Sequence, residues 1–97
     1  MALLGMAPRT THVPASQTDS AIESDASIYV YNLVVEGTST GQVIIEEADG
    51  STVILKASVL ANTSWSLGGA GFLAPRGINV TTPAGVTCTV LHSGPGA

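Results

Sequence analysis

The chain has 97 residues, enough for a single domain with a core of modest size. Three Lys and Arg face seven Asp and Glu, the formal net charge is −4, and charged residues make up only 10% of the sequence. So few cations cannot neutralise several phosphates, which argues against a nucleic-acid-binding protein. The single cysteine, Cys88, excludes an internal disulfide and a two-cysteine zinc motif.

Neither a membrane span nor an export signal stands out. The longest strongly apolar run, Ile28 to Val35, has eight residues, and no basic residue precedes the short apolar patch at the N-terminus. A spanning helix needs about 20 apolar residues, and a secretory signal begins with a basic region. We therefore expect synthesis in a cytoplasm without export by a signal of its own, and no membrane partner.

The first 26 residues differ in pattern from the rest of the chain. Residues 1–26 contain Pro8 and Pro14 and sustain neither a helical period of 3.6 nor a strand period of 2. Such a segment is mobile unless something holds it. We expect an extended N-terminal arm that is ordered mainly by contacts with other chains.

Residues 27–92 read as strands separated by turns, among them an Asp49-Gly50 hairpin signal. The five clear strands are expected at Ser27–Glu36, Gln42–Glu47, Thr52–Leu60, Gly77–Thr82 and Val86–His92. The sequence therefore predicts an all-β fold, a small antiparallel β-sandwich or barrel with an extended N-terminal arm. Residues 93–97 are expected to be a flexible C-terminal tail. A β-domain of 66 residues is marginal by itself, and oligomerisation is one usual remedy.

Alternation within the strands predicts the core. The side chains expected to point inward are Val53, Leu55, Val59, Ile78, Val80, Val86, Cys88 and Val90. Cys88, between two inward valines, is expected to be a buried and inert thiol. The strand from Ser27 to Glu36 is apolar on both faces, which indicates that both faces are covered or that the outer face contacts a partner.

The residues that could carry chemistry are few. His12 and His92 are far apart in the sequence, and two histidines without further ligands do not make a metal site. The Gly-rich stretch at 68–71 lacks the Lys-Ser/Thr ending of a phosphate-binding loop. We expect no catalytic residue, no cofactor and no small-molecule substrate.

The second half of the chain is more informative about partners. From Ala57 to Ala97 the only charged side chain is Arg76, and a surface so poor in charge is typical of one that contacts protein. The candidate interface residues are Trp65, Leu67, Phe72, Leu73, Tyr29 and Tyr31. Two interpretations stay open for the Trp65-to-Leu73 segment: a plug that closes one end of the sandwich, or an anchor in a neighbouring subunit.

Three segments of this half resemble small β-rich virion proteins of tailed bacteriophages: Ile54–Asn62, Pro75–Thr82 and Val86–Leu91. In that group a hydrophobic strand and a long loop precede an Arg/Lys-Gly-hydrophobic-x-Val strand and a final Thr-x-Thr-Val-hydrophobic strand. The similarity covers about residues 28–92. The group includes capsid decoration (cement) proteins, head-fibre bases and other minor head components, so the resemblance implies a structural role in the virion and transfers no catalytic residue.

The resulting hypothesis is a non-enzymatic decoration protein that binds and stabilises the lattice of the major capsid protein on the outer surface of the virion. Such a protein adds buried area across capsomer boundaries and stabilises the assembled lattice by mass action. The resemblance further implies a homotrimer. The alternatives are a host-side binding module, either an adhesin or a carbohydrate-binding β-domain, and another minor virion component such as a head-fibre base. A carbohydrate-binding module would use exposed aromatic residues, with Trp65 and Tyr29 as candidates.

Overall fold

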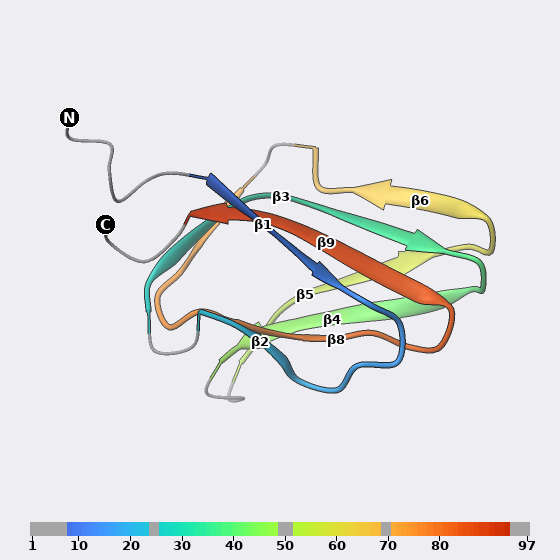
Figure 1. Ribbon diagram of the computed structural model, residues 1–97, viewed down its shortest axis with the longest axis horizontal. Coiled ribbons are helices and arrows are strands. Elements are labelled where there is room, and N and C mark those ends of the chain that lie inside the picture. The colour runs from blue at the N-terminus through green and yellow to red at the C-terminus, as the bar shows by residue number, and fades with distance from the viewer. Residues whose placement is uncertain (1–7, 24–25, 49–51, 69–70, 94–97) are drawn as a thin grey trace.

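A computed structural model of the chain describes residues 8–23, 26–48, 52–68 and 71–93. These residues form strands and turns, without a helix (Figure 1). The strands are β1 (Pro8–Val13), β2 (Ser20–Ile22), β3 (Ile28–Gly37), β4 (Gly41–Glu47), β5 (Val53–Val59), β6 (Thr63–Ser66), β7 (Phe72–Ala74), β8 (Ile78–Thr81) and β9 (Val86–Ser93). The predicted all-β class is confirmed.

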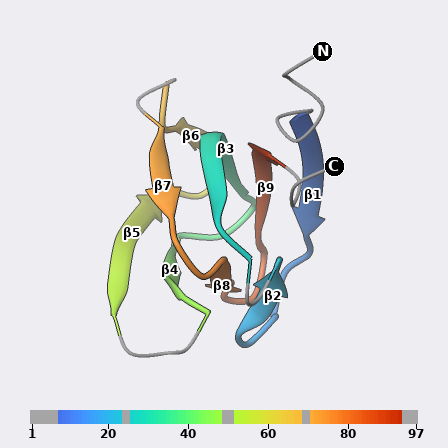
Figure 2. The same ribbon diagram turned by 90° about the vertical axis from the view of Figure 1, so that its left-hand side faces the viewer.

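The strands form two antiparallel sheets that face one another as a sandwich, and Figure 2 shows the two layers nearly end-on. The large sheet has the order β1-β9-β3-β6, and β7 shares with β6 the edge of β3 that β9 leaves open. The small sheet has the order β2-β8-β4-β5. The chain crosses between the sheets repeatedly, so most neighbours within a sheet are distant in sequence.

The core lies between the sheets, and alternation identified most of it. Ile78, Val80, Val86, Cys88 and Val90 are fully buried, as predicted. Val59 is buried as well, and Leu55 is partly buried against the core. Burying one aliphatic side chain of this size stabilises the fold by about 1.5–3 kcal/mol, so these strands supply much of the stability.

A β-bulge explains why β3 is apolar on both faces. Val30 lies opposite His92 and Asn32 opposite Leu91, so Tyr31 is an extra residue with no partner of its own on β9. Before the bulge Ile28 and Val30 point inward. After the bulge the parity reverses, and Leu33 and Val35 are the buried residues. Even-numbered residues before the bulge and odd-numbered residues after it therefore form a single inward face. The interpretation that both faces of β3 are covered was wrong.

A second irregularity moves Val53 out of the predicted core. Ile45 pairs with Leu55, but the next residue, Glu46, pairs with Val53, so the β4–β5 register shifts by one at this point. The shift turns Val53 to solvent, and the side chain is 46% exposed. The prediction that Val53 points inward was therefore wrong.

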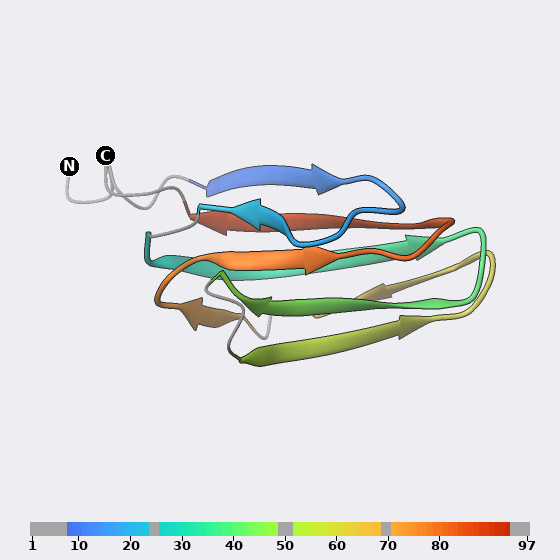
Figure 3. The ribbon, with the colours of Figure 1, turned by 90° about the horizontal axis from the view of Figure 1, so that it is seen from below.

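The N-terminal segment is part of the sandwich, which corrects the boundary predicted at residue 27. β1 pairs with β9 from Pro8 to Val13, and β2 pairs with β8 from Ser20 to Ile22 (Figure 3). Val13 and Ile22 are buried in the core. Within the described residues, the predicted arm is therefore ordered by contacts inside its own chain. Residues 1–7 lie outside the described residues.

The connection between β1 and β2 is also fixed to the body of the domain. The buried Thr82 hydroxyl donates to the Pro14 carbonyl at 2.7 Å and accepts from the Gln17 amide at 3.0 Å. The Thr82 amide donates to the Gln17 carbonyl at 2.8 Å, and the Ser16 amide donates to the Pro83 carbonyl at 3.1 Å. These bonds leave the segment little freedom to detach alone.

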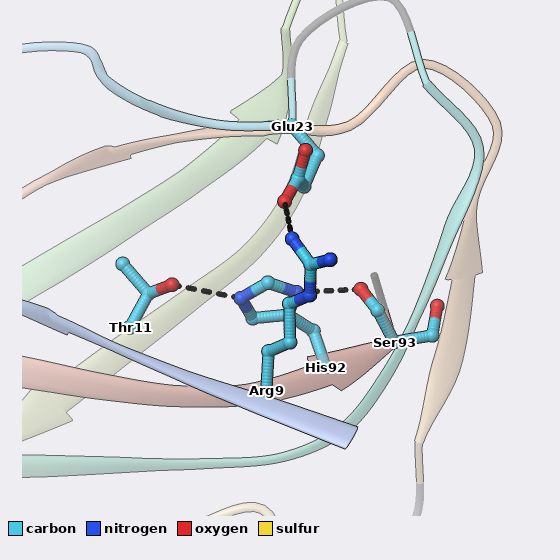
Figure 4. A network of polar contacts seen from close by, with 5 residues as sticks. All are labelled: Arg9, Thr11, Glu23, His92 and Ser93. Atoms are coloured by element: carbon cyan, nitrogen blue, oxygen red, sulfur yellow. Dashed lines mark hydrogen bonds and ion pairs between the residues drawn. The ribbon is translucent and has the colours of Figure 1, made fainter. Parts of the chain in front are cut away.

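An ion pair between Arg9 and Glu23 lies beside two hydrogen bonds of His92, as Figure 4 shows. Arg9 of β1 reaches Glu23, just beyond β2, at 3.3 Å, which links the edges of the two sheets. Beside this ion pair the buried His92 ring contacts the Thr11 hydroxyl through Nε2 at 2.8 Å, and its Nδ1 donates to the Ser93 carbonyl at 2.7 Å. Ser93 belongs to β9 and is buried, so it is not part of a flexible tail as predicted. The rest of the predicted tail, residues 94–97, lies outside the described residues.

Candidate protein-binding surface

The predicted interface residues divide into two groups with different environments. Trp65 lies opposite the buried Val35, and Phe72 lies opposite the buried Val30, so both side chains are on the inward face of the large sheet. Together with Leu67 they are partly buried and pack against the core. This packing agrees with the plug interpretation for these three residues.

The other three predicted residues come together on the outer face of the large sheet. Tyr29 and Leu73 are register partners on β3 and β7, and the Tyr29 and Tyr31 ring centroids are 5.2 Å apart. Leu73 is 62% exposed, whereas the tyrosines are half-buried. Tyr29 and Tyr31 are two residues apart in β3, so strand alternation places both rings on the same face.

Leu91, which was not among the predicted interface residues, extends this surface. It lies on β9 opposite Asn32, next to the bulge, and is 38% exposed. Strand alternation could have indicated its outward direction, because Leu91 stands between Val90 and His92, which point inward. We call Tyr29, Tyr31, Leu73 and Leu91 the tyrosine patch. It crosses three neighbouring strands: β7, β3 and β9.

The tyrosine patch joins two non-coplanar aromatic rings to two aliphatic side chains. The tyrosine rings are inclined by 57° to one another, so they do not make the flat platform on which a sugar ring would stack. Aromatic and aliphatic side chains that stand together at a surface are the composition of protein-interface centres. Beneath the patch the Tyr29 amide donates to the Ser93 hydroxyl at 2.9 Å, which ties the start of β3 to the end of β9.

The residues considered for chemistry are engaged in structural contacts. His12 Nδ1 lies 3.0 Å from the Thr89 hydroxyl on the surface, while His92 contacts Thr11 in the interior. In the described parts of the chain no group of three or more His, Cys, Asp or Glu side chains could hold a metal ion. Cys88 is fully buried, and desolvation raises the pKa of its thiol to about 12.

No helix among residues 8–23, 26–48, 52–68 and 71–93 is long and apolar enough to span a membrane. Comparison of the chain with protein-family models, with curated proteins and with solved structures finds no match.

Proposed function

We propose that this protein is a non-enzymatic decoration protein of a tailed-bacteriophage capsid, and that its tyrosine patch binds the major capsid protein on the outer surface of the particle. The observation that carries the proposal is an exposed leucine beside two tyrosines on one face of the large sheet. Burying Leu73 and its neighbours against a capsid subunit would remove apolar area from water, at about 25 cal/mol per Å² before the costs of association.

The distribution of charge supports the same proposal. Residues 57–97 carry one charged side chain, Arg76, and they include β7 and β9, two of the three strands under the patch. Low charge reduces the desolvation cost of binding and the repulsion between copies placed close together on a lattice. A homotrimer at three-fold or quasi-three-fold positions remains part of the proposal.

The first test asks whether the protein belongs to particles at all. Mass spectrometry of purified particles should find it at a fixed ratio to the major capsid protein, and cryo-EM should place it on the outer surface at lattice symmetry axes. Absence from particles, or a ratio that varies between preparations, would reject a decoration role.

The second test asks whether the tyrosine patch is the contact. Leu73→Ser removes the exposed centre of the patch, while Leu60→Ser changes a leucine of similar exposure, 67%, in the turn between β5 and β6. Cosedimentation of the purified variants with undecorated capsids should show at least a tenfold loss of affinity for Leu73→Ser and no change for Leu60→Ser. Equal affinities of the two variants would exclude the patch as the capsid contact.

A further inference from the structure

A pocket of about 710 Å³ lies at the opposite end of β3 from the tyrosine patch. Its lining comes from the turns that follow β3 and β5 and precede β9, which gather at the right-hand end of Figure 1. The lining residues are Ala15, Glu36, Gly37, Thr38, Asn62, Thr63, Ser64, Gly85 and Thr87. From Tyr29 to Glu36 the strand covers roughly 23 Å at 3.3 Å per residue, so the two surfaces are separate.

The walls of this pocket are held together by the backbone. The Asn62 amide donates to the Gly37 carbonyl at 2.7 Å, and the Thr38 amide donates to the Gly85 carbonyl at 2.9 Å. The Thr38 hydroxyl reaches the same Gly85 carbonyl at 3.3 Å. Because three turns from both sheets are joined in this way, the pocket exists before a ligand arrives, and its formation costs no further ordering.

The chemistry of the lining selects the charge of the ligand. Glu36 is the one charged residue among the lining residues, and the others offer hydroxyl groups, an amide and backbone. An anion would meet a carboxylate with no cation to offset it, whereas an ammonium or guanidinium group gains an ion pair and several oxygen acceptors. The net charge of the whole chain, −4, also favours a positively charged ligand.

The size of the pocket and its side chains narrow the ligand further. A bare calcium ion needs six to eight oxygen ligands, commonly from more than one carboxylate, and Glu36 alone does not provide them. The pocket, of about 710 Å³, is an open groove and not an enclosed cavity, so an elongated ligand can lie along it. The lining contains no aromatic ring on which the apolar face of a sugar could stack. A short extended peptide bearing a basic side chain satisfies all three conditions.

We propose that this pocket binds a lysine or arginine side chain of a partner polypeptide, with the Glu36 carboxylate as its counter-ion and the hydroxyl and amide oxygens around it as further acceptors. The site is independent of the capsid role, since any protein that presents a basic side chain on an extended segment could occupy it.

The test is an NMR titration of the ¹⁵N-labelled full chain at low ionic strength with the peptide acetyl-Gly-Arg-Gly-amide. Saturable shifts are expected for the amides of residues 36–38, 62–64 and 85–87, and they should weaken as salt is added. The same peptide with norleucine in place of arginine should produce no shifts. Glu36→Gln should reduce the affinity at least threefold.

Glu47→Gln is the matched control, because it removes the same charge from the end of β4, outside the pocket. It should leave the affinity unchanged. Equal losses in the two variants would mean non-specific attraction to an acidic protein and would overturn the proposal. Amide shifts caused by methyl glucoside or spermidine, with none caused by the arginine peptide, would also overturn the proposal. If this protein binds the arginine peptide but does not cosediment with capsids, the pocket proposal stands and only the decoration role is rejected.

Discussion

Gly77 offers the sharpest test of whether the N-terminal segment belongs to the sandwich. Its φ is +78°, and a Cβ at this position would lie 2.1 Å from the Glu23 carbonyl oxygen and 2.7 Å from that of Ile22. Both obstacles are backbone atoms at the end of β2, so no side-chain rotation can relieve the clash. Gly77→Ala therefore requires β2 to move away from the turn that precedes β8.

Gly68 is the matched control. Its φ is +74°, almost the same, but a Cβ there meets open space. Alanine in the left-handed region costs about 1–2 kcal/mol, and the smaller entropy of the unfolded chain returns about 0.4–1 kcal/mol. Gly68→Ala should therefore destabilise the protein by only about 1 kcal/mol.

Gly77→Ala adds the cost of displacing β2. Uncovering Ile22, which is buried, loses about 1.5–3 kcal/mol, and each lost strand hydrogen bond costs about 0.5–1.5 kcal/mol. The Arg9–Glu23 pair is largely exposed on the arginine side and contributes little. The total loss should be about 3–5 kcal/mol.

Urea unfolding of the two variants beside the parent protein gives the free energies. A difference between Gly77→Ala and Gly68→Ala of less than 1 kcal/mol would show that residues 22–23 do not lie on this turn. That result would restore the detached arm predicted from the sequence. Hydrogen exchange of the isolated protein gives an independent reading, because protected amides in β1 and β2 are expected only if both strands are docked.

Other predictions concern the core and its polar contacts. Cys88→Ser should cost about 1–3 kcal/mol, because a hydroxyl would be buried among valines, and a bulky thiol reagent should label native Cys88 only on the unfolding timescale; rapid labelling would contradict its burial. Burial raises the pKa of the Cys88 thiol to about 12, so between pH 9 and 12 the thiol ionises in the unfolded chain but not in the folded one. The free energy of unfolding should therefore fall by up to about 1.4 kcal/mol per pH unit above pH 9. Urea unfolding from pH 8 to 11 checks this, and an equal slope in Cys88→Ala would refute it. Thr11→Val should destabilise by about 1–2 kcal/mol, because it leaves Nε2 of the buried His92 without its partner; a calorimetric midpoint equal to the parent's would count against the contact. Trp65→Ala should lower folding stability by at least 2 kcal/mol as its ring leaves the core; a weaker assembly with unchanged stability would favour the anchor interpretation instead.

Strand alternation predicted the buried residues correctly wherever two paired strands keep a constant register. The whole of β9 from Val86 to Val90, and Ile78 and Val80 in β8, follow it. It failed at the two places where the register shifts, after Val30 in β3 and after Ile45 in β4. A bulge is a property of two paired strands, so the period of one strand alone does not reveal it.

The N-terminal strands were missed for a different reason. β1 is an edge strand with one fully buried apolar side chain, Val13, and β2 has only three residues, of which Ile22 is buried. Neither is long enough to establish a period of two above a background of Thr, Ser and Ala. Their stability comes from bonds to the distant Thr82 and to β8 and β9, which local sequence cannot show.

The bulge also changes the argument for assembly. An apolar β3 on both faces was one of three reasons to expect an oligomer, and the bulge now accounts for most of that pattern within a single chain. A second reason, Trp65 as an outward anchor, loses force because its side chain packs against the core. What remains is the scarcity of charge from residue 57 onward and the exposed Leu73 beside two tyrosines. The exposed leucine and the tyrosines lie on the large sheet, to which the charge-poor region contributes β6, β7 and β9. Capsid binding and self-association through the tyrosine patch would therefore compete for one face unless the trimer forms on the lattice itself.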